Sequence, residues 1–237
     1  MNLSNVPGVL AQSRSGNQDI RITIRGYGAR GAGERSNSGT TRGIRVLMDG
    51  FPETEPDGRT SFDLIDLAGA GSIEVVRSNA SSLWGNASGG VVSIRSNSSF
   101  DSPYASLHSS FGSYGFHKES FRVGTMLDVG RLFLSINNTT SEGWRYHSSS
   151  AQTLVNTGIV SQLGERTSLG VYLAGTSNLF RIPGPLSIQQ FDSLGRQSES
   201  IYIRRDERRM NRIGRLGVAL SPTISFVSQG PVVSVAP

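Results

Sequence analysis

Three glycines near the N-terminus have the spacing of a dinucleotide-binding loop. Gly26, Gly28 and Gly31 follow the apolar run 20–24 in the pattern G-x-G-x-x-G, and Asp49 lies about twenty residues further on. In such a site the last glycine opens an amphipathic helix, whose N-terminus receives the pyrophosphate. The residues that follow Gly31 show no apolar periodicity. The sequence therefore argues against a nucleotide site and favours glycines that serve a loop at the end of a strand.

Other side chains capable of chemistry are scattered. The histidines lie far apart and lack metal-ligand spacing: His108, His117 and His147. Three aspartates lie closer together: Asp57, Asp63 and Asp66. No nucleophile, general base or oxyanion device accompanies these carboxylates, so they suggest no catalytic pair. We therefore expect no catalytic residue, no metal site and no cofactor, and we do not expect an enzyme.

Composition narrows the class of protein further. The chain has 237 residues, a net charge of +5, no cysteine and a single lysine, so arginines supply almost all of its positive charge. The arginines at 204–205 and 208–209 are separated by Asp206 and Glu207, which favours a solvated loop over a nucleic-acid surface. No apolar run approaches the roughly 18 residues of a membrane helix, and no signal peptide opens the sequence.

Residues 1–100 indicate a small α+β domain. Short, continuous apolar runs are separated by Gly-rich loops, as in strands that are covered on both faces. Two segments, 62–70 and 79–85, are predicted to be short helices with Asp63 and Asn79 as N-caps and Gly85 as the stop. The pair Gly89 and Gly90, before the run 91–94, predicts a close approach of two backbone segments.

Residues 101–220 change to long alternating strands. About six runs alternate apolar with polar side chains, and tight turns alternate with longer connections, which is typical of a membrane β-barrel. A soluble β-sandwich also alternates, but its strands are usually shorter. The apolar set is predicted to face lipid: Leu107, Phe111, Phe121, Val123, Leu132, Leu134, Leu169, Val171, Leu173, Leu216 and Val218. The polar face is predicted to line the lumen: Ser106, Arg122, Ser135 and Tyr172. Residues 221–237 lose the alternation and are predicted to be an irregular tail.

A series of motifs then resembles the plug domain of TonB-dependent outer-membrane receptors. The motifs are VPGV at 6–9, IRITIRGYG at 20–28, GIRVLMDGFP at 43–52, IDLAGAGSIEVVR at 65–77 and SSLWGNASGGVVSI at 81–94. Ser78 and Asn79 stand where the family has Gly and Pro, and Trp84 stands where it has Tyr. The resemblance implies a plug inside a 22-stranded barrel, of which this chain holds the plug and the first strands.

The resemblance also implies a function. Such receptors take up a scarce small-molecule ligand, often a ferric chelate such as a siderophore, with energy from the TonB complex of the inner membrane. The implied location is the lipid of the outer membrane in a Gram-negative-type bacterium. The plug loops 27–42 and 52–60 are expected to face the ligand, and their arginines are the candidate ligand-binding residues: Arg30, Arg35, Arg42 and Arg59.

Arg25 and Arg77 end two plug strands and are the candidate plug–barrel contacts. The resemblance implies that they lie close together, point toward the barrel wall and pair with glutamates of later strands. Trp84 is expected to pack beneath the turn that contains it. Because the expected barrel strands number about six, the chain is expected to be a fragment, truncated at both ends. The alternative function is a β-rich surface adhesin or binding module without transport.

Overall fold

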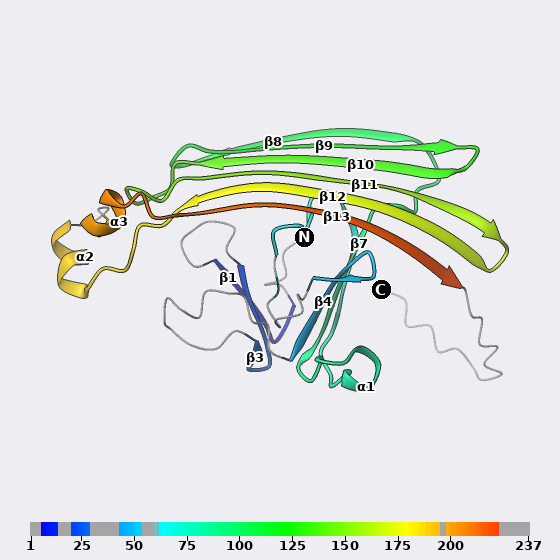
Figure 1. Ribbon diagram of the computed structural model, residues 1–237, viewed down its shortest axis with the longest axis horizontal. Coiled ribbons are helices and arrows are strands. Elements are labelled where there is room, and N and C mark those ends of the chain that lie inside the picture. Colours follow the sequence, from blue (N-terminus) through cyan, green and yellow to red (C-terminus); the bar gives the residue numbers. More distant parts are fainter. Residues whose placement is uncertain are drawn as a thin grey trace.

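The computed structural model describes residues 6–13, 20–28, 43–53, 60, 62–194 and 198–222. An N-terminal domain lies beneath a long curved sheet, and two short helices lie at one end of that sheet (Figure 1). The domain precedes the sheet in sequence without intertwining with it, as the change of pattern near residue 100 predicted.

The N-terminal domain contains two small sheets. The first has the order β1-β2-β3 and is antiparallel, with β1 at Val9–Ser13, β2 at Ile20–Ile24 and β3 at Tyr27–Gly28. The second has the order β5-β4-β7-β6. Its strands are β4 (Ile44–Met48), β5 (Phe51–Pro52), β6 (Ala70–Val76) and β7 (Gly90–Ser96). β4 and β7 are parallel, and the other pairs are antiparallel.

The core of this domain is formed by the apolar strand runs. Ile24, Val46 and Val92 are completely buried, and they pack in one cluster with residues of β1, β2, β4 and β7. Two-residue turns join β2 to β3 and β4 to β5, and their central residues all have positive φ, as type I′ hairpins require. Gly26, which the dinucleotide pattern singled out, lies in the first of these turns.

The prediction for the Gly89–Gly90 pair is confirmed. A Cβ on Gly90 would lie 2.3 Å from the carbonyl oxygen of Val76, and one on Gly89 would lie 2.3 Å from the Cβ of Tyr27. Gly90 also has a φ of 142°, a conformation that other residues rarely adopt. Glycine at these positions therefore allows β7 to begin directly against β6 and the β2–β3 hairpin.

Of the two helices predicted in this domain, the structure contains one. Residues 62–70 form turns and the start of β6, so the helix predicted there is wrong. The helix α1 exists but is short, Ser81–Trp84, and Gly85 ends it with a φ of 71°. Its N-cap is Ala80, and the Asn79 side chain instead accepts a hydrogen bond from the Ser81 amide. Trp84 is 44% exposed, so its predicted packing beneath the turn is also wrong.

The second part is a six-stranded antiparallel sheet in sequence order, open at β8 and β13. Its strands are β8 (Tyr104–Gly112), β9 (Phe116–Leu127), β10 (Gly130–Ser141), β11 (Ser150–Gly164), β12 (Thr167–Arg181) and β13 (Arg208–Pro222). The helices α2 (Ile188–Leu194) and α3 (Ser200–Arg204) lie in the connection from β12 to β13. β13 extends into the segment predicted to be an irregular tail, and residues 223–237 lie outside the described residues.

The two faces of this sheet differ as the alternation predicted. Seven of the eleven predicted outward residues are among the exposed large hydrophobic side chains: Leu107, Phe111, Phe121, Leu132, Leu173, Leu216 and Val218. Ser106, Arg122, Ser135 and Tyr172 lie on the concave face toward the N-terminal domain, where Ser135 is buried. No helix in the described part of the chain is long and apolar enough to cross a bilayer.

Candidate functional site

Polar side chains join the N-terminal domain to the concave face of the sheet. The first contact is an ion pair between Arg215 on β13 and Glu53, which directly follows β5. Glu53 is buried, and the Arg215 side chain is only 18% exposed. The Arg215 guanidinium also lies 5.6 Å from the ring centre of Phe51, whose ring meets that of Tyr172 edge-on at 5.8 Å. This end of the contact therefore combines a shielded charge pair with aromatic packing.

A second ion pair lies six residues earlier on β13. Arg209 donates to the Asp63 carboxylate at 3.0 Å, and Asn211 donates to the same oxygen at 2.8 Å. Asp63 is buried, with 5% of its surface exposed. Arg209 and Arg215 both lie on β13, so this strand contacts two carboxylates of the domain, those of Asp63 and Glu53.

A third contact surrounds Asp66, which is 1% exposed. Its Oδ1 accepts hydrogen bonds from the Gly69 amide at 2.7 Å and from the Asn137 side chain on β10 at 2.9 Å. Arg122 on β9 donates to the Ala68 carbonyl at 2.9 Å. These bonds explain why segment 62–70 is not helical, since its side-chain and backbone polar groups are used locally and by the sheet.

A fourth contact connects the β4–β5 turn, β7 and β11. The Asp49 carboxylate accepts hydrogen bonds from the amide and the hydroxyl of Ser96 at 2.7 and 2.8 Å. The Ser96 hydroxyl accepts one from the Asn156 side chain at 2.8 Å. Asn156 is 1% exposed, so this chain of bonds lies inside the contact between the two parts.

Burial changes the acidity of two of these carboxylates. Burial raises the pKa of the Glu53 carboxyl above its ordinary value, and the Arg215 guanidinium opposes this shift without cancelling it. Burial likewise raises the pKa of the Asp49 carboxyl, and the hydrogen bonds from Ser96 lower it by less than burial raises it. Both groups are therefore less readily ionised here than in water.

The predicted contact residues Arg25 and Arg77 lie close together but away from these contacts. Arg25 donates to the carbonyl oxygen of Arg77 at 3.0 Å, and Arg77 donates to the carbonyl oxygen of Pro7 at 2.7 Å. Both side chains are exposed. The four predicted ligand-binding residues lie outside the described residues: Arg30, Arg35, Arg42 and Arg59.

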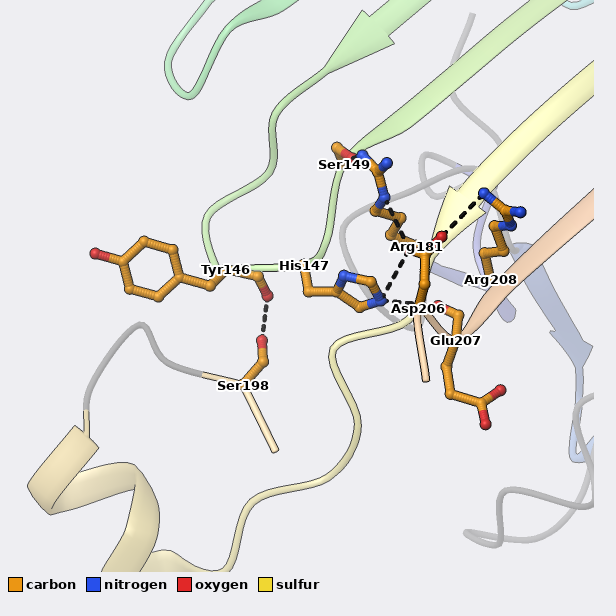
Figure 2. A network of polar contacts seen from close by, with 8 residues as sticks. All are labelled: Tyr146, His147, Ser149, Arg181, Ser198, Asp206, Glu207 and Arg208. Carbon is orange, nitrogen blue, oxygen red and sulfur yellow. Dashed lines mark hydrogen bonds and ion pairs between the residues drawn. The ribbon is translucent and has the colours of Figure 1, made fainter. Parts of the chain in front are cut away.

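The two long connections of the sheet are bound to each other at one end. Asp206 lies between Arg181 and Arg208, at 3.3 and 2.9 Å, and the His147 ring approaches the Glu207 carbonyl at 3.1 Å (Figure 2). Arg145 donates to the Gly184 carbonyl at 2.8 Å. Arg204, Arg205 and Arg208 are exposed, as a solvated loop requires, and Asp206 and Glu207 also bind Arg181 and His147.

Sequence reasoning missed the carboxylates of the domain as contact residues. The sequence pattern predicts a helix cap at Asp63, and no catalytic group accompanies Asp66 in the sequence. Their partners on β10 and β13 are 71 and 146 residues away in the chain. A weak signal was present, since arginines and asparagines on the concave face of an alternating sheet need acceptors opposite them.

Comparison with known proteins agrees with this arrangement. Residues 2–91 match the family model of the TonB-dependent receptor plug domain. The ferric citrate transporter FecA in its unliganded form matches 83% of this chain and 31% of its own, with 23% identity and a TM-score of 0.64. FpvA of P. aeruginosa, bound to a heterologous pyoverdine, matches 94% of this chain and 29% of its own, with 13% identity and a TM-score of 0.62.

A third similar structure is BauA, the ferric preacinetobactin receptor from Acinetobacter baumannii. It matches 75% of this chain and 25% of its own, with 20% identity and a TM-score of 0.57. The chain thus spans less than a third of the length of each of these structures, and the likeness to them is one of fold. The matched family and these neighbours are receptors and transporters, not enzymes. Residues 2–91 therefore match the TonB-dependent receptor plug domain, and the open sheet that follows is similar in fold to part of the barrel of these structures.

Proposed function

We propose that this chain is part of an outer-membrane receptor that takes up a scarce ligand in a TonB-dependent way. The observation that carries the proposal is a plug domain seated by charged pairs on the concave face of a sheet whose convex face is apolar. A soluble sandwich would bury that apolar face against a second sheet. An outward apolar face suits lipid, and a polar concave face suits a plugged lumen.

The proposed ligand is a ferric chelate such as a siderophore. Three neighbours in fold are named for such ligands, namely ferric citrate, ferric preacinetobactin and ferripyoverdine. In this chain the proposed binding residues are Arg30, Arg35, Arg42 and Arg59, whose positive charge would attract an anionic chelate. The TonB complex of the inner membrane is the proposed protein partner.

Arg25 and Arg77 are proposed to contact a part of the barrel wall outside the six strands. Their side chains are exposed and lie together, and within the described residues neither forms an ion pair. The ion pairs with the six strands have the opposite polarity, since there the plug supplies the carboxylates. Two exposed arginines side by side therefore remain available for carboxylates elsewhere on the wall.

Uptake measurements test this proposal. The receptor that carries this sequence is expressed in a receptor-null strain, and accumulation of radiolabelled ferric chelates is measured with and without the TonB complex. We expect accumulation that depends on the TonB complex and is weakened when the four loop arginines are changed together to alanine. Accumulation that persists without the TonB complex would contradict the proposal. Surface binding without any accumulation of any chelate would favour the adhesin instead.

A further inference from the structure

A cavity of about 150 Å³ lies between the plug and the inner face of β9, β10 and β11. Apolar residues of the plug core line one side of it, including Ile22, Val46 and Ile94. The sheet supplies a polar side with Lys118, Asn137 and other residues, and the Asp66 carboxylate reaches the cavity from the plug. The cavity therefore has one acidic and one basic side chain at a largely apolar site.

Within the described residues, three buried oxygen atoms in this region lack hydrogen-bond partners, and two of them belong to residues that line the cavity. They are Asp66 Oδ2, Asn137 Oδ1 and Ser120 Oγ. They belong to one cluster, because Asn137 donates to the other Asp66 oxygen and lies directly opposite Ser120 in the β9–β10 pairing. A buried carboxylate oxygen without a donor is costly, so this cluster requires a donor.

The arginine on the same face of β9 does not meet this requirement. Arg122 follows Ser120 on the inner face of β9, but it donates to the Ala68 carbonyl and the Ser106 hydroxyl. Arg209 and Arg215 on β13 are paired with Asp63 and Glu53.

Lys118 is the remaining cation at the cavity and the only lysine in the sequence. It lies opposite Thr139 in the β9–β10 pairing, two residues before Ser120, so both side chains are on the inner face. Within the described residues its ammonium makes no hydrogen bond or ion pair. An ammonium on a flexible four-carbon stem carries three donors, and the cluster presents three oxygens without partners.

We propose that the Lys118 ammonium closes into the cluster of Asp66, Ser120 and Asn137 and so locks plug segment 62–69 to the barrel wall. The lock is a conformational device that is independent of which ligand the receptor takes up. Closure pairs the Asp66 carboxylate with a charge and places a salt bridge across the cavity. Opening removes this salt bridge and leaves the segment bound to β9 and β10 only by the hydrogen bonds from Arg122 and Asn137.

Amine labelling tests the position of the lysine. The receptor in detergent is treated with an N-hydroxysuccinimide ester, and modification of Lys118 is followed by peptide mass spectrometry. We expect Lys118 to react at least about tenfold more slowly than in Asp66→Asn, which removes the charged acceptor. Glu119→Gln is the matched control, since it removes a carboxylate from the same strand on the opposite face, where Glu119 is 52% exposed. Equal labelling rates in the receptor and in Asp66→Asn would overturn the lock.

Hydrogen exchange tests whether the lysine holds the plug segment. The Gly69 amide, which donates to Asp66 Oδ1, is the reporter. Lys118→Met should speed exchange of the Gly69 amide about tenfold, and Lys118→Arg should speed it less. In a protein that already carries Asp66→Asn, adding Lys118→Met should change the exchange rate of Gly69 little. Additive effects of the two changes would overturn the proposal. So would faster Gly69 exchange in the unchanged receptor when sodium and potassium are replaced by N-methylglucamine, because a solvent cation would then occupy the cluster.

Discussion

The plug and the barrel sheet place their apolar side chains in opposite ways. In the plug, Val46 and Val92 are completely buried in a core between strands. In the sheet, Leu107 is 73% exposed and Leu216 is 71% exposed, while the concave face holds buried Asn156 and Ser135. The plug has the arrangement of a water-soluble domain, and the sheet has the arrangement expected where lipid replaces water on the convex side.

The contact between the two parts follows from this difference. Because the sheet keeps its apolar residues on the outside, it offers the plug polar and charged groups, and the plug meets them with carboxylates. The contact therefore combines ion pairs such as Arg215 with Glu53 and a small apolar cluster of Leu64 with Leu154 and Ala174. Such pairs are directional, and removing one partner leaves a buried charge, so each of them fixes the position of the plug.

The largest expected effect comes from a charge placed in the plug core. Val46→Asp should destabilise the plug by about 4 kcal/mol or more, because an unpaired carboxylate would be buried where Val46 is completely buried. The free energy of unfolding is measured by proteolysis of the plug in increasing urea, with the receptor in detergent. Leu107→Asp on the convex face is the control and should leave the plug unchanged. Equal effects of the two changes on the plug would remove the distinction between the two regions.

The next effect concerns the charged contact. Arg215→Met should destabilise the seated plug by about 3–5 kcal/mol, because Glu53 would remain buried without its partner. Adding Glu53→Gln should restore part of the loss, which the same urea assay would detect. No recovery in the double variant would show that Arg215 acts through its packing on Phe51 and not through its charge.

The third effect depends on the surroundings of the convex face. Leu216→Arg should destabilise the receptor in a lipid bilayer by about 2–4 kcal/mol if the position lies near the bilayer midplane. Leu216→Met, which keeps an apolar side chain of similar size, should cost under about 1.5 kcal/mol. Folding into vesicles of defined lipid, followed by urea titration, measures both. A cost for the arginine variant no greater than for methionine would argue against a lipid-facing surface.

The smallest effect concerns pH. Glu53 and Asp49 have raised pKa values in the folded plug, so over the pH range between their unfolded and folded pKa values the folded state binds more protons. Their contribution to stability is therefore full below the unfolded pKa values and falls as pH rises through the folded ones. Urea midpoints measured from pH 4 upward should show this fall, and it should be smaller in Glu53→Gln with Asp49→Asn. An unchanged slope in the double variant would contradict the assignment.

Patterns within one strand were enough to predict much of the fold. The switch from short apolar runs to long alternating strands near residue 100 predicted a domain followed by antiparallel barrel strands, and both parts are present. The alternation also predicted which face each side chain takes, because a strand places successive residues on opposite sides. The pair Gly89 and Gly90 predicted a close backbone approach, since only glycine fits there.

Local patterns failed where a distant strand decides the structure. Segment 62–70 resembles a helix in sequence, but Asp63 and Asp66 are bound by Arg209 and Asn137, and the Gly69 amide turns back onto Asp66. The sequence likewise did not predict that the sheet supplies the arginines and the plug the carboxylates of these ion pairs, because the arginines were expected on the plug.

The sequence alone thus determined where the strands lie, which face of the sheet their side chains occupy, and the plug motifs. These features depend on the alternation of apolar residues and on glycine spacing, which act over a few residues. Only the tertiary structure decided which charges meet. Partners such as Glu53 and Arg215 stand 162 residues apart, and nothing in the local pattern of either one specifies the other. Their pairing follows from the fold of the sheet over the plug, which places Arg215 and Arg209 of β13 against Glu53 and Asp63.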